Sequence, residues 1–215
     1  VIFYRYGATP WIGVILGGII ASAVAALISY PCFRLKGHYF AIATMASAEI
    51  VKQIFVSWEY VEGATGISLP IISRSAGFFK RLFYLQFNDK LPWLYICLIL
   101  FSTVIFFCNY VENSKMGYYL KAIRESHEVA ESIGINPTNY KLYAMIISAF
   151  ISAICGSIYA QYILYIDPFM VFSMDISMKI VLLTVLGGVG NIFGPIIGAA
   201  IFIPLSEFTR IQLGG

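Results

Sequence analysis

The chain has 215 residues, of which 60% are hydrophobic and 12% are charged, and its mean hydropathy is +0.82. Soluble domains carry about 25% charged residues, so this composition excludes an ordinary soluble domain and indicates a protein embedded in a bilayer. The net charge of +3 comes without a long basic run, which argues against nucleic-acid binding. The sequence also lacks the short alternating strands of a membrane β-barrel. We therefore expect an all-α bundle of transmembrane helices, forming a single domain over residues 1–215.

Long uncharged stretches mark where the chain can cross a bilayer. Four of them lie between Arg5 and Arg34, between Lys90 and Glu112, between Lys141 and Asp167, and between Lys179 and Glu207. A fifth apolar stretch, Gly37–Val56, contains only two charges. About 20 apolar residues let a helix cross the hydrocarbon core, so we predict about five hydrophobic segments. The chain begins at Val1 without a signal-peptide pattern, and we expect it to be part of a longer protein.

Small residues recur at four-residue spacing in three of these segments. The rows are Gly13, Gly17, Ala21 and Ala25; Ser148, Ser152, Gly156 and Ala160; and Gly190, Gly194 and Gly198. Helices in lipid associate through close contact of small residues. The rows predict the faces on which these helices pack against neighbours.

Glu49 is the carboxylate that lies well inside an apolar segment. A charge at the membrane centre costs about 2.5–3.5 kcal/mol on insertion scales. Lys52 and Gln53, three and four residues further on, can partner it on the same helix face. Two interpretations follow: Glu49 belongs to a translocation pathway or gate, or it forms a local ion pair near the membrane surface.

The interval Asn113–Lys141 is rich in charge. At 100° per residue, an α-helix places Lys121, Arg124, Glu125, Glu128 and Glu131 on one arc. Apolar side chains, among them Leu120, Ile123, Val129, Ala130 and Ile133, fill the opposite side. Gly134 suits the residue after a helix end, and Pro137 prevents continuation. The pattern predicts one short amphipathic helix between two spans, whose apolar face either docks a partner or lies on lipid.

The last apolar segment, Ile180–Ser206, is too long for one straight span. Its 27 residues would reach about 40 Å as a helix, against a hydrocarbon core of about 30 Å. Its middle holds backbone-freeing and helix-breaking residues: Gly187, Gly188, Gly190, Asn191, Gly194 and Pro195. We predict a broken or re-entrant element that lines a translocation pathway, as interrupted helices do in transporters. The alternative is a tight helix crossing with a proline kink.

Cysteines and histidines give no sign of a metal site. Cys32, Cys97, Cys108 and Cys155 have no paired spacing, and we expect them to be small apolar side chains. His38 and His127 lie in different segments. We therefore predict neither a metal site nor a catalytic centre.

Three separated stretches of the sequence resemble the permease subunit of branched-chain amino acid ABC transporters. They are Gly37–Thr44 with Ala48–Val51 and Gly63–Ile67; Leu120–Glu125 with Ala130–Asn136 and Lys141-Leu142; and Val185–Gly190 with Phe193–Ala199. Their order and spacing agree with the family over nearly all of the chain. Glu128-Val129-Ala130 with Gly134 is similar to the Glu-Ala-Ala…Gly coupling signature of ABC permeases, although Ile146-Ile147 replaces the downstream Leu-Pro.

The resemblance implies a permease of the prokaryotic inner membrane that binds no cofactor itself. Its expected partners are a second related permease, two cytoplasmic subunits that bind ATP, and an extracytoplasmic substrate-binding protein. It also implies that Leu120–Asn136 is a cytoplasmic coupling segment, and so sets an orientation that Lys and Arg, seven against six, leave undecided. The coupling residues would be Leu120, Ile123, Arg124, Glu128, Ala130 and Gly134.

Two alternatives remain. Related permeases that import urea, short amides or sugars share these motifs. A polytopic membrane enzyme would need convergent ionisable residues inside the membrane, and the sequence offers no such cluster. The GxxxxGK[ST] phosphate-binding motif is also missing, so any ATP would be bound by a partner.

Overall fold

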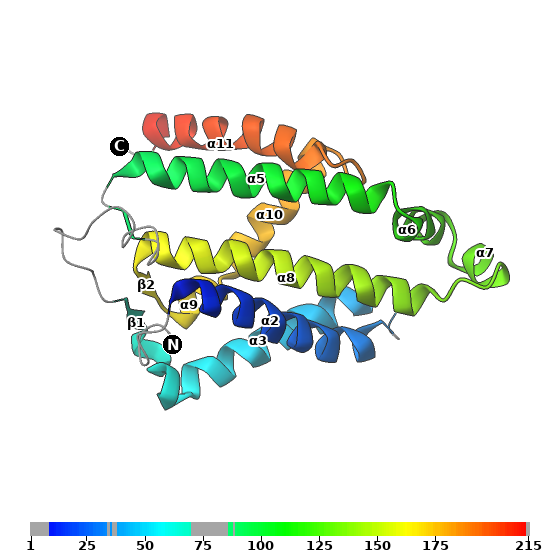
Figure 1. Cartoon of the computed structure of the whole chain (residues 1–215), viewed down its shortest axis with the longest axis horizontal. Helices are drawn as coiled ribbons and strands as arrows, with labels where there is room; N and C mark the ends of the chain where they lie inside the picture. Colours follow the sequence, from blue (N-terminus) through cyan, green and yellow to red (C-terminus); the bar gives the residue numbers. More distant parts are fainter. Residues whose placement is uncertain (1–8, 34, 36–37, 70–85, 88, 214–215) are drawn as a thin grey trace. The chain divides into compact units, whose positions relative to one another are not determined.

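The computed structural model describes residues 9–33, 35, 38–69, 86–87 and 89–213. The helices are α2 (Pro10–Cys32), α3 (His38–Ser57), α5 (Lys90–Glu112), α6 (Lys115–Glu125), α7 (His127–Ser132), α8 (Pro137–Ile163), α9 (Pro168–Val171), α10 (Met174–Gly187) and α11 (Gly194–Leu213). Two single-turn helices, η1 (Glu59–Val61) and η2 (Gly63–Thr65), and two short strands, β1 (Ile67–Ser68) and β2 (Tyr165–Ile166), complete these ranges (Figure 1). The predicted all-α class is confirmed. Gly37, which opens the first family-like stretch, lies outside the described residues.

Among the residues that the structure describes, six helical stretches are long and apolar enough to cross a membrane. They are Pro10–Cys32, Tyr39–Ser57, Lys90–Glu112, Pro137–Ile163, Pro168–Gly187 and Gly194–Gln212. The sequence predicted about five hydrophobic segments, one of them broken. The broken segment, Ile180–Ser206, belongs to two helices with a loop between them, which accounts for the sixth stretch. Most apolar side chains on these helices are exposed, as Leu27 (78%) and Phe106 (75%) show, which suits helices that face lipid or other membrane helices.

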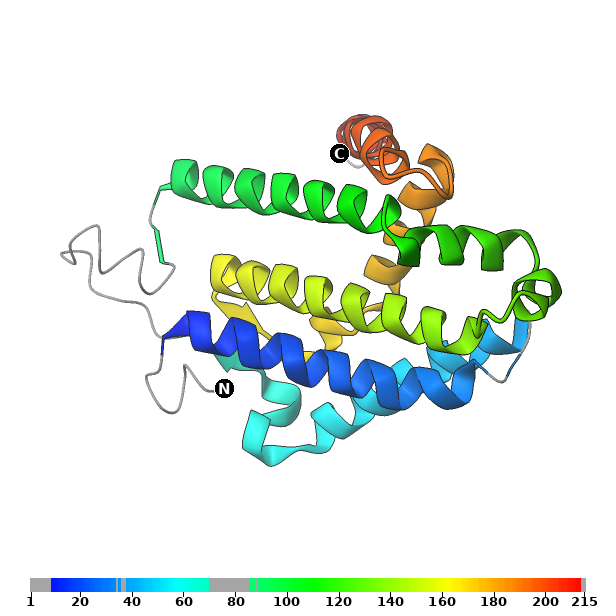
Figure 2. The ribbon, with the colours of Figure 1, turned by 45° about the vertical axis from the view of Figure 1, so that its right-hand side comes forward.

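The first compact unit, which ends at Phe172, is built around the antiparallel contact of α2 with α8 (Figure 2). Gly18 lets the helices approach closely, because a Cβ there would lie 2.7 Å from the Phe150 ring. The Ser22 hydroxyl donates to Gly18 O at 2.8 Å and also reaches Ile146 O, across the contact, at 3.3 Å. These contacts join the middle thirds of both helices.

The small-residue rows predicted this contact only on the α2 side. A Cβ added to Gly17 on α2 would lie 3.8 Å from the Ser157 hydroxyl oxygen on α8. On α8, however, Ser148, Ser152 and Gly156 are exposed. The row on α8 was therefore wrong as a packing face within this chain, because larger side chains such as Phe150 fill the groove beside Gly18.

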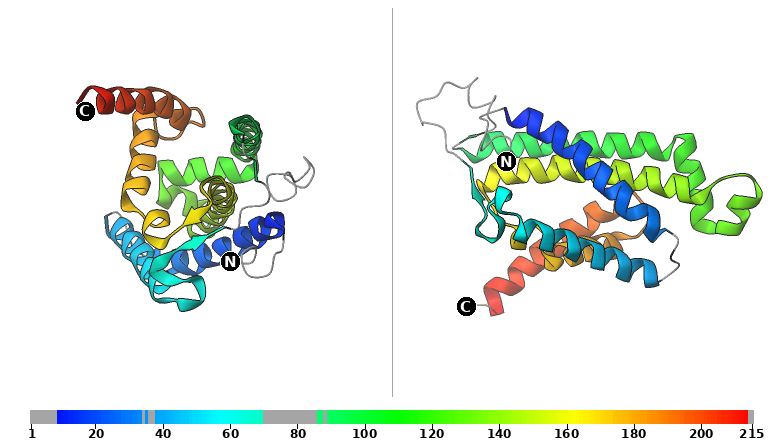
Figure 3. Two further views of the ribbon diagram at one scale, coloured as in Figure 1. Left: turned by 90° about the vertical axis from the view of Figure 1, so that its left-hand side faces the viewer. Right: turned by 90° about the horizontal axis from the view of Figure 1, so that it is seen from below.

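The two strands tie the α3 end of the chain to the end of α8. Ile67 pairs with Ile166 and Ser68 with Tyr165 in an antiparallel register. The Tyr165 hydroxyl donates to Thr65 O at 3.0 Å. Gly66 has φ +74° and a Cβ there would lie 2.8 Å from Ile166 O, so this turn requires glycine. The strands lie at the end of α8 opposite to α6 and α7 (Figure 3).

The second compact unit, Ser173–Gly215, contains α10 and α11. The two helices meet in close contact near their connecting loop. A Cβ on Gly198 would lie 2.0 Å from Leu183 O, and one on Gly194 would lie 2.2 Å from Gly188 O. Glycine at both positions is what allows these backbones to touch.

A tight corner joins α5 to α6. The Ser114 hydroxyl accepts from Gly117 N at 3.4 Å and so caps α6. Gly117 is buried, and a Cβ there would lie 2.2 Å from Glu112 O and 2.5 Å from Val111 O. Both neighbours are backbone atoms of α5, so they cannot rotate away.

We expect Gly117→Ala to open this corner and to lower the melting temperature of the detergent-solubilised protein, since overpacking typically costs about 1–3 kcal/mol. Gly156→Ala is the matched control, because nothing lies within 4 Å of its Cβ position in α8. Alanine there should be neutral or stabilising, since it favours a helix interior by about 0.5–1 kcal/mol over glycine. Equal melting temperatures for the two variants would contradict the assigned role of Gly117.

Candidate functional site

The polar interval between α5 and α8 folds as two helices, so the prediction of one amphipathic helix was wrong. The break is at Ser126, which is extended (φ −156°, ψ 125°) between the end of α6 and the start of α7. Its hydroxyl accepts from Val129 N at 3.4 Å. A serine followed by an acid in the first turn, here Glu128, is a helix-start signal that the uniform 100° projection ignored.

The apolar side of this segment is covered by the chain itself. Ile123 is 4% exposed and Ala130 is 1% exposed. Both α6 and α7 pack on α8, and the Tyr119 and Tyr140 rings meet edge-on at 5.0 Å across the α6–α8 contact. Ile123 and Ala130 therefore hold the segment in place, and a partner cannot reach them in this conformation.

A different surface faces outward. Val129 is 61% exposed and Ile133 is 66% exposed, although the helical projection placed both on the apolar side with Ile123. The bend at Ser126 reorients α7 and turns them outward. With the exposed Glu128, Val129 and Ile133 form what we call the outer face of α7; Arg124, at the end of α6, is also exposed.

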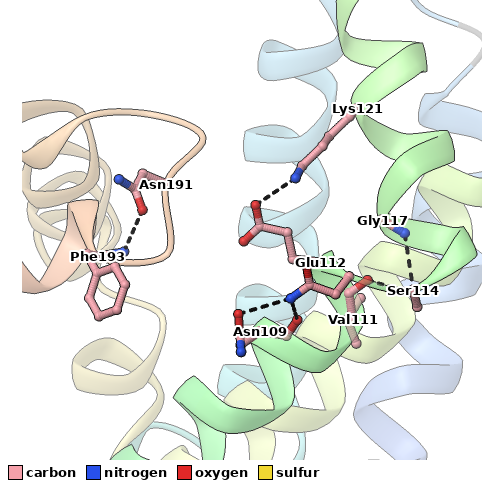
Figure 4. A network of polar contacts seen from close by, with 9 residues as sticks. Asn109, Val111, Glu112, Ser114, Gly117, Lys121, Asn191 and Phe193 are labelled. Carbon is pink, nitrogen blue, oxygen red and sulfur yellow. Dashed lines mark hydrogen bonds and ion pairs between the residues drawn. The ribbon is translucent and has the colours of Figure 1, made fainter.

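Polar contacts fix this segment at both ends. Lys121 Nζ lies 2.7 Å from Glu112 Oε1, which bridges α6 to the end of α5 (Figure 4). Lys141 on α8 hydrogen-bonds to His127 Nε2 on α7. The Asn136 side chain accepts from Thr138 N at 3.1 Å and from Asn139 N at 3.3 Å, and so starts α8. Gly134, with φ +82°, provides the turn before it.

The six predicted coupling residues are thus close together. Leu120, Ile123 and Arg124 lie on α6, Glu128 and Ala130 on α7, and Gly134 in the turn behind it. Their part in coupling stays a prediction, but only Arg124, Glu128 and Gly134 among them are exposed.

Glu49 forms a local ion pair. Its Oε1 lies 3.0 Å from Lys52 Nζ, and the two side chains are 51% and 22% exposed. Lys52 Nζ also lies 5.7 Å from the centre of the Phe169 ring. The pair sits near the middle of the 20-residue α3 and not at a helix end.

The glycine-rich segment of the second unit breaks the chain, as predicted. α10 ends at Gly187 and α11 begins at Gly194, and the loop contains two glycines with positive φ, Gly188 (102°) and Gly190 (92°). The exposed Asn191 accepts from Phe193 N at 3.1 Å through its side-chain oxygen (Figure 4).

Pro195 lies in the first turn of α11, where proline is tolerated, so it starts a helix and does not kink one. The tight crossing considered as the alternative is also present, between the two halves at Gly187 and Gly194. A pathway role for this loop stays a prediction.

Within the described ranges no three His, Cys, Asp or Glu side chains lie together as metal ligands would.

The sequence pattern of a family described as "Branched-chain amino acid transport system / permease component" matches residues 1–214. With this match and several helices able to span a membrane, the chain belongs to this permease family. It is 28% identical over 236 residues to the high-affinity branched-chain amino acid transport system permease protein LivM of Salmonella typhimurium, covering 99% of this chain and 55% of the relative. LivH of the same organism is 27% identical, with 90% of this chain and 64% of the relative covered.

A third relative is the nucleoside ABC transporter permease protein NupC of Lactococcus lactis, which is 22% identical over 71% of this chain and 49% of its own length. No solved structure matches the chain. The chain spans only 55% of the length of its LivM relative from Salmonella typhimurium.

Proposed function

We propose that this chain is part of the membrane permease of an ATP-driven importer that moves leucine, isoleucine or valine across the inner membrane of a prokaryotic cell. The observation that carries the proposal is the family match over residues 1–214, combined with six helices able to span a membrane. The chain is similar both to LivM and to LivH of one organism, which supports pairing with a second, related permease.

In this function, ATP hydrolysis by a separate pair of ATP-binding subunits would supply the energy for transport. The chain has no phosphate-binding motif of its own. An extracytoplasmic binding protein would deliver the amino acid to the end that holds β1 and β2, if α6 and α7 face the cytoplasm. Cyclic closure of the ATP-binding pair would then move α6 and α7, and through them α8.

Uptake by the complete transporter tests the substrate. Cells that contain this permease with its partner permease, ATP-binding subunits and binding protein should accumulate labelled leucine, isoleucine or valine, and should stop when the ATP-binding subunits are inactivated. The nucleoside permease relative makes a nucleoside the natural comparison substrate. Uptake of nucleosides, urea or sugars without branched-chain amino acids would overturn the substrate assignment.

Docking of the ATP-binding subunits is proposed at the outer face of α7. The exposed Val129 and Ile133 offer apolar contacts, and the exposed Glu128 next to Val129 supplies a charge. Fully desolvated apolar contacts with a polar rim are the usual makeup of a strong interface. This assignment replaces Ile123 and Ala130, which the chain already covers.

We expect Val129→Asp combined with Ile133→Asp to release the ATP-binding subunits during purification, because both charges would be buried unpaired in the interface. The melting temperature of the permease should stay unchanged, since both side chains are exposed. Ile123→Asp is the contrasting variant and should lower the melting temperature, because residue 123 is 4% exposed. Full retention of the ATP-binding subunits by the double variant would move the docking surface elsewhere.

Glu49 is proposed as a pathway group. Its carboxylate is half-exposed near the middle of a candidate span. Facing lipid there would cost about 2.5–3.5 kcal/mol, so this side of α3 should meet water or other protein groups.

We expect Glu49→Gln to lower uptake severalfold with the amount of protein in the membrane unchanged. Glu207→Gln is the matched control, because Glu207 forms the same i,i+3 type of pair, with Arg210 at 2.6 Å, and is 53% exposed against 51% for Glu49. Normal uptake by Glu49→Gln would show that its pair with Lys52 is only structural.

A further inference from the structure

A cavity of about 420 Å³ lies between α2, α5 and α8. Ser22 lines it from α2, Thr103, Val104 and Phe107 from α5, and Ile147 and Ile154 are among the liners from α8. These residues lie near the middle of each candidate span, so the cavity is at mid-membrane depth. Its volume falls within the range of about 300–1,000 Å³ that is usual for small-molecule sites.

The chemistry of the cavity limits what can occupy it. Eight of the ten described lining residues are apolar, and the other two are Ser22 and Thr103. Their hydroxyl protons are already used: Ser22 donates to Gly18 O at 2.8 Å and Thr103 donates to Ile99 O at 2.8 Å. Neither an ammonium nor a carboxylate finds an opposite charge among these residues, so the cavity suits an aliphatic group.

A second observation on α8 points to a ligand. Gln161 is 7% exposed, and its Oε1 has no hydrogen-bond partner among the described residues. Gln161 follows Ile154 by seven residues, which places it on the same face of α8 about two turns nearer to β2. Buried acceptors are normally satisfied. Gln161 Oε1 is covered in this conformation and does not line the cavity, so a ligand amine would reach it only when the helices around it move during transport.

We infer that the cavity receives the aliphatic side chain of the transported amino acid during its passage, and that Gln161 accepts a hydrogen bond from its ammonium group nearer to the β2 end. This inference rests on the proposed function. It adds that size selection for a branched side chain takes place inside this chain, between α2, α5 and α8. A lipid acyl chain would also fit the apolar walls, and competition by excess leucine distinguishes the two occupants.

Photolabelling of the complete transporter tests the inference directly. Cells that take up leucine are illuminated with a leucine analogue that carries a diazirine in its side chain, and labelled peptides are mapped by mass spectrometry. We expect label on residues 100–107 of α5 and 146–154 of α8, and excess leucine should reduce it. Label elsewhere, or label that leucine does not reduce, overturns the inference and leaves the proposed function standing. If the cells take up no branched-chain amino acid, both the inference and the proposed function are overturned.

A matched pair of variants tests the size of the cavity. Val104→Phe fills it, and we expect the ratio of leucine to valine uptake to fall about tenfold, as for pockets that exclude one methylene. Leu98→Phe adds the same ring on α5 at a residue that is 55% exposed and outside the lining, so its ratio should stay at the wild-type value. An unchanged ratio in Val104→Phe, with normal amounts of protein, contradicts the inference.

Gln161→Leu separates binding from stability. Replacing an unsatisfied buried acceptor by an apolar side chain of similar size is neutral or stabilising for the fold, so the melting temperature should hold or rise. Uptake should nevertheless fall severalfold. Normal uptake by this variant would remove Gln161 from the proposed path, and a lower melting temperature would show that it is a structural residue.

Discussion

The close contact between α2 and α8 is the interaction on which the first unit depends. Gly18 lets the Phe150 ring rest on the α2 backbone, and the Ser22 hydroxyl reaches the α8 backbone at Ile146. In a bilayer no hydrophobic force brings two apolar helices together, so close packing and hydrogen bonds must do so. α8, held in this way, contacts other elements at both ends. α6 and α7 pack near its start, and β2, which follows its end, pairs with β1.

α8 links the polar interval to the cavity. It contacts α6 and α7 and lines the cavity between Ile146 and Ile154. A displacement of α6 and α7 by a partner would therefore reach the cavity through one continuous helix of 27 residues. This gives a short mechanical route from an external docking surface to the middle of the membrane.

Several polar groups within the candidate spans form ion pairs or hydrogen bonds within their own helix. Glu49 is paired with Lys52, and serine and threonine hydroxyls within the spans, such as those of Ser47 and Thr184, donate to backbone oxygens of the preceding turn. Such local satisfaction lets each helix enter lipid at low cost. Among the described residues, Gln161 Oε1 is a buried side-chain oxygen that has no hydrogen-bond partner.

The sequence by itself determined the membrane class, the approximate spans, the break at Gly187–Pro195 and the position of the polar interval, because these depend on local hydropathy and on backbone chemistry at Gly and Pro. It did not determine which side of the polar interval is covered. The helix ends at Ser126 and a second helix begins there. In the packed chain Ile123 and Ala130 are buried, whereas Val129 and Ile133 face outward. The central cavity likewise depends on tertiary structure, since its lining comes from three helices that are distant in sequence and acquire a common surface only when they pack together.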